Sequence, residues 1–119
     1  MAKILAVDDD LSILELYKEI FTKAGFEILT AEDAISALTR FQDFKPDILV
    51  LDVDLPAGGG QKVFERLRSI FLVGIPIIFS TAFPERVENL KKNFNVVILK
   101  KPVIAETLIG EAKKLLKMP

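Results

Sequence analysis

Five short apolar runs recur along the chain, and amphipathic segments separate them. The runs predict strands at residues 3–7, 27–30, 48–51, 76–79 and 96–99. Runs this apolar are typical of strands that are buried on both faces of a parallel sheet. The second run is less apolar than the others, which indicates a strand at a sheet edge.

Between the runs, apolar residues return at the spacing of a helix face. The predicted helices cover residues 13–24, 33–44, 58–70, 85–92 and 105–117. Ser12 and Glu15 fit a capping box before the first helix, and Gly25 is a suitable residue to end it. Lys45-Pro46 would end the second helix, because the residue before a proline disfavours helical backbone.

Strands that alternate with helices favour right-handed crossovers and an all-parallel sheet covered on both faces. The pattern therefore predicts a doubly wound α/β fold with five strands, in a single domain spanning residues 1–119. Half of the residues are hydrophobic, so a chain of this length can bury its own core. In such folds the functional site lies beyond the carboxyl ends of the strands.

The composition narrows the classes of function. Sixteen basic residues nearly balance seventeen acidic ones, which gives no global attraction to nucleic acid or to an anionic membrane. Cysteine and histidine are absent, which excludes disulfides and thiol-bound or imidazole-bound metals. No apolar run approaches the length of about 18 residues that a membrane-spanning helix needs, and the start of the chain is unlike a signal peptide. A cytoplasmic location is therefore expected.

Chemically useful side chains follow four of the five predicted strands. They are Asp8-Asp9 after the first, Asp52 after the third, Ser80-Thr81-Ala82 after the fourth and Lys100-Lys101-Pro102 after the fifth. If the first and third strands are neighbours, their carboxylates converge at one edge of the sheet. Crowded carboxylates repel one another unless a cation lies among them, so the cluster predicts a hard divalent ion, with Mg²⁺ as the first candidate.

This ordered set of residues resembles the receiver domains of bacterial two-component response regulators over essentially the whole chain. The matching features are Asp8-Asp9, the segment Leu51-Asp52-Val53-Asp54-Leu55-Pro56 with Gly60 beyond it, Thr81-Ala82 and Lys101-Pro102. The resemblance implies a flavodoxin-like (β/α)5 fold with strand order 2-1-3-4-5. It also implies that Asp52 accepts a phosphoryl group from a phosphohistidine on a sensor histidine kinase or a histidine phosphotransfer protein.

The same resemblance implies roles for the other site residues. Asp9 and Asp52 would bind Mg²⁺ directly, Asp8 would act through water, and the backbone carbonyl of Asp54 would add a ligand. Thr81 and Lys101 would contact the phosphoryl oxygens, and the peptide bond before Pro102 would be cis. Such a protein catalyses its own phosphoryl transfer and dephosphorylation and is not a conventional turnover enzyme.

The signal-reading surface is expected on residues 85–92, 96–99 and 105–117, which would control an output partner or domain, or form a homodimer. Direct binding to nucleic acid or to a membrane is not expected of this domain. One position departs from the family pattern, because Ile98 stands three residues before Lys101, where many receivers have an aromatic residue. The aromatic movement that accompanies phosphorylation in those receivers is therefore not expected here.

Other interpretations use the same residues. Taken singly, Asp8-Asp9-Asp10 fits a polar turn that caps a helix, and Asp10 fits a surface position. Asp52-Val53-Asp54 also fits the core of haloacid-dehalogenase-type phosphatases, although Pro56 replaces their downstream threonine. A flavodoxin-like electron carrier would have the same strand order, but the acids would repel a flavin phosphate. A pseudo-receiver would keep the fold without phosphorylation.

Overall fold

A five-stranded parallel sheet forms the centre of the computed structural model, with the order β2-β1-β3-β4-β5. The structure describes residues 1–55, 59–69, 74–92 and 95–118. The strands are β1 (Lys3–Val7), β2 (Glu27–Ala31), β3 (Ile48–Asp52), β4 (Ile77–Thr81) and β5 (Val96–Lys100). The helices are α1 (Leu11–Lys23), α2 (Ala34–Phe44), α3 (Gly59–Ser69), the 3₁₀ helix η2 (Pro84–Lys92) and α4 (Ala105–Leu115). The predicted fold class and strand order are confirmed.

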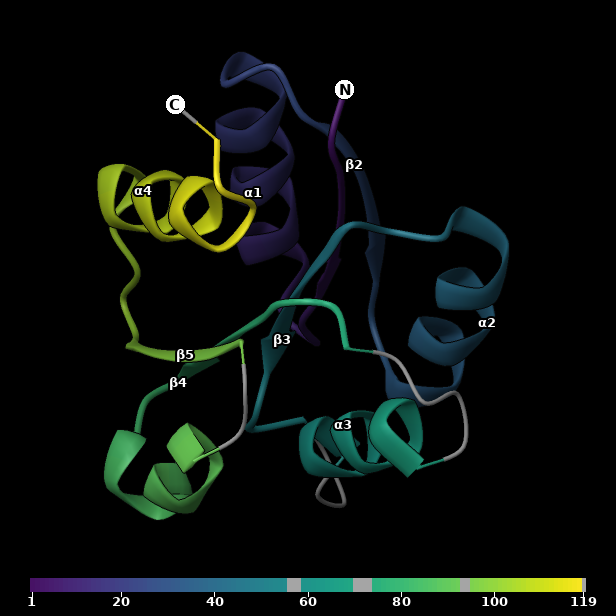
Figure 1. The fold of residues 1–119 in the computed structure, drawn as a ribbon, viewed down its shortest axis with the longest axis vertical. Helices are drawn as coiled ribbons and strands as arrows, with labels where there is room; N and C mark the ends of the chain where they lie inside the picture. Colours follow the sequence, from purple (N-terminus) through teal and green to yellow (C-terminus); the bar gives the residue numbers. More distant parts are fainter. Residues whose placement is uncertain (56–58, 70–73, 93–94, 119) are drawn as a thin grey trace.

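Helices cover both faces of the sheet (Figure 1). Successive strand residues point to opposite faces, so Leu5 and Val7 belong to the core cluster that also contains residues of α2, α3 and η2. Ile4 and Ala6 pack against α1 and α4 on the other face. Because the central strands are buried on both faces, they are apolar without interruption, and this property made them recognisable in the sequence.

The first helix begins differently from the prediction. The carboxylate of Asp10 accepts hydrogen bonds from the backbone N–H groups of Ser12 and Ile13, at 2.9 and 3.4 Å, so Asp10 is the N-cap. The capping box of Ser12 and Glu15 is therefore wrong, and Glu15 instead pairs with Lys18. Asp10 has a structural role in addition to its exposed position.

The helix ends agree with the turn residues in the sequence. Gly25 follows α1 with a φ of 89°, a left-handed conformation that glycine adopts without steric cost. Lys45 ends α2, also with positive φ, directly before Pro46. The predicted helix at residues 85–92 is the 3₁₀ helix η2, with a kink at Val87. The third helix starts at Gly59, and both Gly58 and Ile70 lie outside the described residues.

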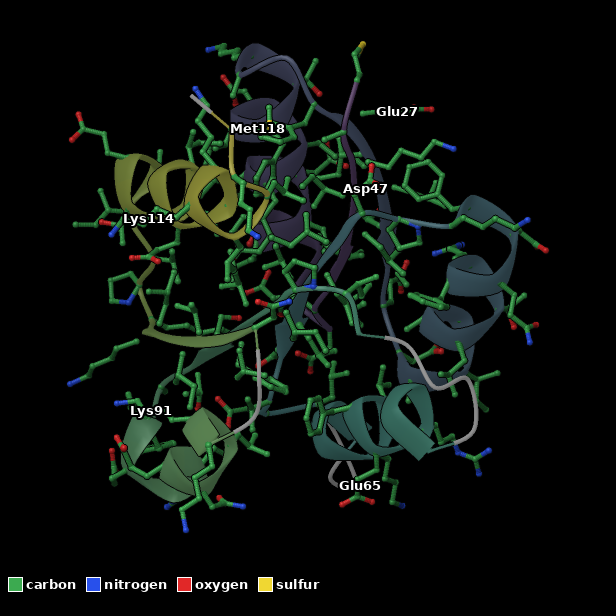
Figure 2. The ribbon with its side chains drawn as sticks, in the orientation of Figure 1. Glu27, Asp47, Glu65, Lys91, Lys114 and Met118 are labelled. Carbon is green, nitrogen blue, oxygen red and sulfur yellow. The ribbon has the colours of Figure 1, made fainter. Side chains whose placement is uncertain are left out.

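The sheet edges are β2 and β5. The apolar side chains of β5 are only half-buried, unlike those of β3 and β4. Charged side chains surround the core, and Figure 2 shows Glu65, Lys91 and Lys114 projecting outward from three different helices. Within the described parts of the chain, no helix has the length and apolarity needed to cross a membrane.

Candidate functional site

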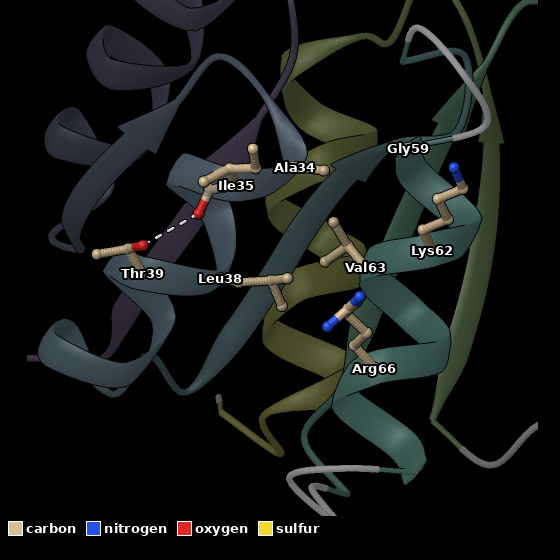
Figure 3. A pocket seen from close by; sticks show the side chains of 8 residues that line it. All are labelled: Ala34, Ile35, Leu38, Thr39, Gly59, Lys62, Val63 and Arg66. Carbon is tan, nitrogen blue, oxygen red and sulfur yellow. Dashed lines mark hydrogen bonds between the residues drawn. The ribbon is translucent and has the colours of Figure 1, made fainter.

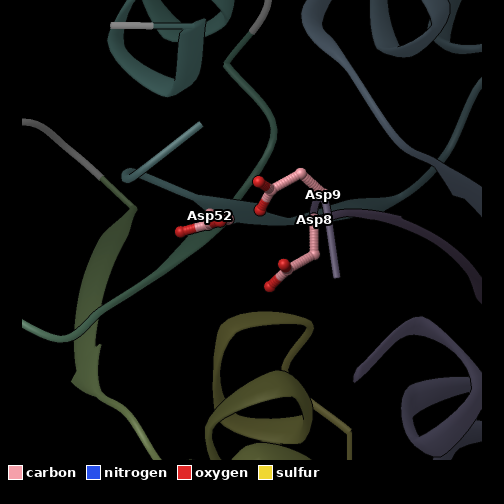
Figure 4. Close-up of side chains that lie close together, drawn as sticks. All are labelled: Asp8, Asp9 and Asp52. Atoms are coloured by element: carbon pink, nitrogen blue, oxygen red, sulfur yellow. The ribbon is translucent and has the colours of Figure 1, made fainter. Parts of the chain in front are cut away.

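Three carboxylates meet beyond the carboxyl ends of β1 and β3. Asp8 and Asp9 directly follow β1, and Asp52 is the last residue of β3 (Figure 4). One oxygen of each carboxylate lies within 4.8 Å of one oxygen of the other two. Asp8 and Asp52 are buried, whereas Asp9 is exposed to solvent. Oxygen donors at this spacing fit a hard divalent cation.

Lys101 provides the positive charge that faces this cluster. Its Nζ lies 3.1 Å from Asp8 Oδ2 and 3.2 Å from Asp52 Oδ1. The backbone places this side chain beside β4, because the Lys101 N–H donates to the Thr81 carbonyl at 2.8 Å. The Lys101–Pro102 peptide bond is cis, as the resemblance to receiver domains implied. A single ammonium therefore bridges two buried carboxylates.

The buried charges change the pKa values of Asp52 and Lys101. Burial raises the pKa of Asp52 to about 6, and the negative charge of Asp8 adds to this effect, while the Asp54 N–H and Lys101 oppose it. Burial would lower the pKa of Lys101, but its hydrogen bonds and ion pairs with Asp8 and Asp52 together raise it. Lys101 is therefore protonated at neutral pH, and Asp52 titrates close to the physiological range.

The hydroxyl of Thr81, at the end of β4, does not hydrogen-bond to Asp8, Asp9 or Asp52. Its Oγ1 donates to the carboxylate of Asp54, 3.1 and 3.0 Å from the two oxygens. The Ala82 N–H also donates to Asp54 Oδ2, and the Phe83 N–H donates to Thr81 Oγ1, each at 3.1 Å. The side chain of Asp54 thus holds the end of β4, a role that the sequence did not reveal.

Two further polar side chains, those of Ser80 and Tyr17, lie near the site. The Ser80 hydroxyl is fully buried and has no hydrogen-bond partner within normal distance in the described structure. Tyr17 of α1 is nearby, and burial raises the pKa of its phenol, an effect that the Ser80 hydroxyl opposes. Tyr17 is also a member of the hydrophobic core on this face of the sheet. The charges of Asp8, Asp52 and Lys101 also act on this phenol.

The structure thus brings Asp8, Asp9, Asp52 and Lys101 together at the edge where the sequence placed them. It places Thr81 beside Asp54. The Asp54 N–H donates to Asp52 Oδ1 at 2.9 Å, so the backbone of Asp54 also borders the cluster. The only sequence signal for the side-chain role of Asp54 was an acid two residues beyond a strand end, which many loops share.

The comparison with family models decides the family. Residues 4–113 match the response regulator receiver domain. The chain belongs to this family. Membership places it among domains of phosphorylation-dependent signalling, and it settles the choice between a receiver and the phosphatase or flavodoxin interpretations.

Curated relatives of this receiver domain are longer proteins. The chain is 39% identical over 88 residues to the alkaline phosphatase synthesis transcriptional regulatory protein PhoP of Bacillus subtilis, covering 74% of this chain and 36% of that protein. It is 31% identical over 115 residues to the transcriptional regulatory protein CrdR of Helicobacter pylori, covering 94% and 54%. The chain therefore spans about a third to a half of these relatives.

Solved receiver structures share the whole fold. The receiver domain of the Francisella response regulator 1452 matches with a TM-score of 0.87 and 28% identity, covering 98% of both chains. The chemotaxis protein CheY4 of Vibrio cholerae matches with a TM-score of 0.86 and 31% identity, covering 97% of this chain and 98% of that one.

Proposed function

We propose that Asp52 accepts a phosphoryl group from a phosphohistidine and that this modification switches the domain between two signalling states. The placement of Asp52 is the main support. It is buried at the end of β3, between the acids that follow β1 and the ammonium of Lys101. The donor would be a sensor histidine kinase or a histidine phosphotransfer protein.

The hydrogen bonds of Asp52 favour one of its two oxygens as the nucleophile. Oδ1 accepts from the Asp54 N–H and lies beside Lys101, whereas no hydrogen bond from the described residues reaches Oδ2. In the proposed step, Oδ2 forms a bond to phosphorus and the P–N bond of phosphohistidine breaks. The electron pair of that bond returns to the ring nitrogen, the imidazole takes one proton from solvent and leaves as neutral histidine, and Asp52 becomes an acyl phosphate.

The acid cluster fits Mg²⁺ as the cofactor. Asp9 and Asp52 would bind the ion directly, Asp8 would act through water, and the carbonyl of Asp54 would complete the set of protein ligands. The exposure of Asp9 leaves one side of the cluster open to solvent. Bound there, Mg²⁺ would neutralise the charge that a phosphoryl group adds to a carboxylate cluster.

Lys101 would stabilise the phosphoryl oxygens. Its flexible stem and compact ammonium let it hold Asp8 and Asp52 at rest and then turn to the phosphoryl group. Thr81 would donate its hydroxyl to the same group, and to do so it must leave Asp54. The Ala82 N–H also donates to Asp54, and the Phe83 N–H donates to the Thr81 hydroxyl. A movement of Thr81 would therefore move the start of the segment that leads to η2.

The signalling surface would consist of η2, β5 and α4. Within η2 only Val87 and Leu90 are buried, so few contacts resist its displacement. Ile98 is half-buried and has no aromatic ring to rotate, so we infer that the backbone of residues 82–92 carries most of the change. This surface would bind an output partner or domain, or a second copy of the chain, and DNA contact would belong to another domain.

Phosphorylation from acetyl phosphate in the presence of Mg²⁺ tests the proposed function. The wild-type protein should gain one hydroxylamine-sensitive phosphoryl group, and Asp52→Asn should gain none. Asp54→Asn is the matched control, because it removes the neighbouring acid and keeps the acceptor. Labelling of Asp52→Asn at the wild-type level, or no labelling of either protein as in a pseudo-receiver, would contradict the proposal.

A further inference from the structure

A groove of 480 Å³ separates α2 from α3 on the side of the sheet away from α1 and α4. Figure 3 shows the residues that line it, which are Ala34, Ile35, Leu38, Thr39, Gly59, Lys62, Val63 and Arg66. Gly59 lies at a close approach to Leu55 and Ala34, because a Cβ atom there would lie 3.2 Å from Leu55 Cβ and 3.5 Å from Ala34 Cβ. The volume is within the range of about 300–1,000 Å³ that is usual for binding sites.

The α2 wall of the groove is apolar. Ile35 is 81% exposed, more than any other large apolar side chain of the described residues except Met1. Leu38 lies one turn further along the helix and turns toward α3, where Val63 faces it (Figure 3). Thr39 adds little polarity, because its hydroxyl donates to the Ile35 carbonyl at 3.1 Å. Binding grooves are usually lined mainly by apolar side chains with a few polar groups, and this wall fits that description.

The α3 wall is cationic. Lys62 and Arg66 are four residues apart, so both line the same side of the helix. Neither makes a hydrogen bond or ion pair in the described structure, although Lys18, Lys23 and Lys91 each pair with a glutamate on their own helix. Figure 3 shows Arg66 reaching toward the groove below Val63 and Lys62 extending past Gly59. The groove therefore offers two positive charges that have no partner among the described residues.

We propose that this groove binds an acidic amphipathic helix of a partner protein. The apolar pair on α2 and the charged pair on α3 both repeat at the spacing of one helical turn. A partner helix lying between them would place apolar residues against Ile35 and Leu38. Its glutamates or aspartates, one turn apart, would face Lys62 and Arg66. Lys62 and Arg66 would repel a basic helix, so these two charges favour an acidic partner over a basic one as well as attracting it.

This surface is separate from the proposed phosphoryl chemistry. It uses none of the acids at the strand ends, and it lies outside η2, β5 and α4. Docking here is therefore expected in Asp52→Asn as well as in the wild-type protein. A failure of phosphorylation and a failure of docking are thus independent results.

A labelled synthetic peptide tests the proposal. The peptide is a helix with leucines along one face and glutamates one turn apart beside them, and a second peptide carries lysines in place of the glutamates. The acidic peptide should bind, with NMR shifts at residues 34–39 and 62–66, and the basic peptide should not. Lys62→Glu/Arg66→Glu should weaken binding about tenfold or more, since two exposed attractions become repulsions.

The matched control is Lys91→Glu/Lys92→Glu, which changes the net charge equally but on η2. Its affinity for the acidic peptide should equal that of the wild type. Ile35→Asn should also weaken binding, because it removes the apolar contact and keeps both cations. All these positions are exposed, so the variants should remain folded. Equal weakening by Lys62→Glu/Arg66→Glu and by Lys91→Glu/Lys92→Glu would overturn the proposal. Binding of decanoate, a fatty-acid anion, without binding of the acidic peptide would also overturn it.

Discussion

The Thr81 hydroxyl donates a hydrogen bond to the Asp54 carboxylate, at 3.0 and 3.1 Å from its two oxygens. Asp54 lies two residues beyond Asp52, the proposed phosphoacceptor. The Ala82 N–H binds the same carboxylate. In the resting domain Asp54 therefore fixes the carboxyl end of β4. If the phosphoryl group recruits Thr81, it must compete with Asp54, so this pair sets part of the free-energy cost of switching.

A double-mutant cycle with Asp54→Ala and Thr81→Val measures that cost. In the unmodified protein we expect a coupling free energy of unfolding of about 1.5–3 kcal/mol, typical of a hydrogen bond to a charged group. With beryllofluoride bound at Asp52 as a phosphoryl mimic, the coupling should fall toward zero, because Thr81 will have left Asp54. A coupling that is the same in both states would show that Thr81 stays with Asp54.

Asp52 should make stability depend on pH in the absence of metal. Its pKa is about 6 in the folded protein, against 3.8 for an ordinary aspartate, so folding favours the protonated form. This contribution is fully present below the ordinary pKa and is lost as the pH rises through 6. Between about pH 4 and pH 7, wild-type protein in EDTA should lose on the order of 2–3 kcal/mol relative to Asp52→Asn. Urea unfolding of both proteins across this pH range measures the difference. If the free energies of unfolding of the wild type and Asp52→Asn change in parallel with pH, the raised pKa of Asp52 is contradicted.

Mg²⁺ should stabilise the unmodified domain. Binding to the folded state alone adds about 2.7 kcal/mol at a hundredfold excess over Kd, and it also relieves repulsion among the acids. The melting temperature should rise with Mg²⁺ in the wild-type protein and not in Asp9→Asn. Asp10→Asn is a suitable control, because it alters the α1 cap and leaves the cluster. An equal rise in the wild-type protein and Asp9→Asn would remove Asp9 from the metal site.

Hydrogen exchange should locate the switching segment. With beryllofluoride and Mg²⁺, the amides of residues 82–92 should change their exchange rates more than those of α1 and α2. Val87 and Leu90 are the two buried side chains of η2, so small changes at Thr81 can shift the whole segment. Changes confined to α1 and α2 would contradict this assignment, and Asp52→Asn should show no change at all.

The parts of the fold that the sequence predicted depend on patterns along neighbouring residues. The central strands are buried on both faces, which leaves uninterrupted apolar runs, and parallel strand ends necessarily bring Asp8, Asp9 and Asp52 to one edge. Gly25 was identifiable because α1 ends in a left-handed turn. Each of these features follows from local chemistry and the alternation of strands and helices.

The features that the sequence did not reveal depend on the three-dimensional structure. They concern a choice between residues of similar chemistry, or a contact between residues far apart in the chain. Asp10 and Ser12 are both good caps, and the structure begins α1 at Leu11, which makes Asp10 the cap. The bond between Asp54 and Thr81 joins residues 27 positions apart, and it depends on how the ends of β3 and β4 align. Arg66 and Lys62 look like ordinary solvated residues until α2 is placed beside them.

Reductive trapping of the acyl phosphate tests the central claim most directly. After acetyl phosphate and Mg²⁺, borohydride converts a phosphorylated aspartate into homoserine, and peptide mass spectrometry identifies its position. We predict homoserine at position 52 alone, and none in Asp52→Asn. Homoserine at Asp8, Asp9 or Asp54, or at no position in a protein that binds Mg²⁺, would contradict the assignment of Asp52 as the phosphoacceptor.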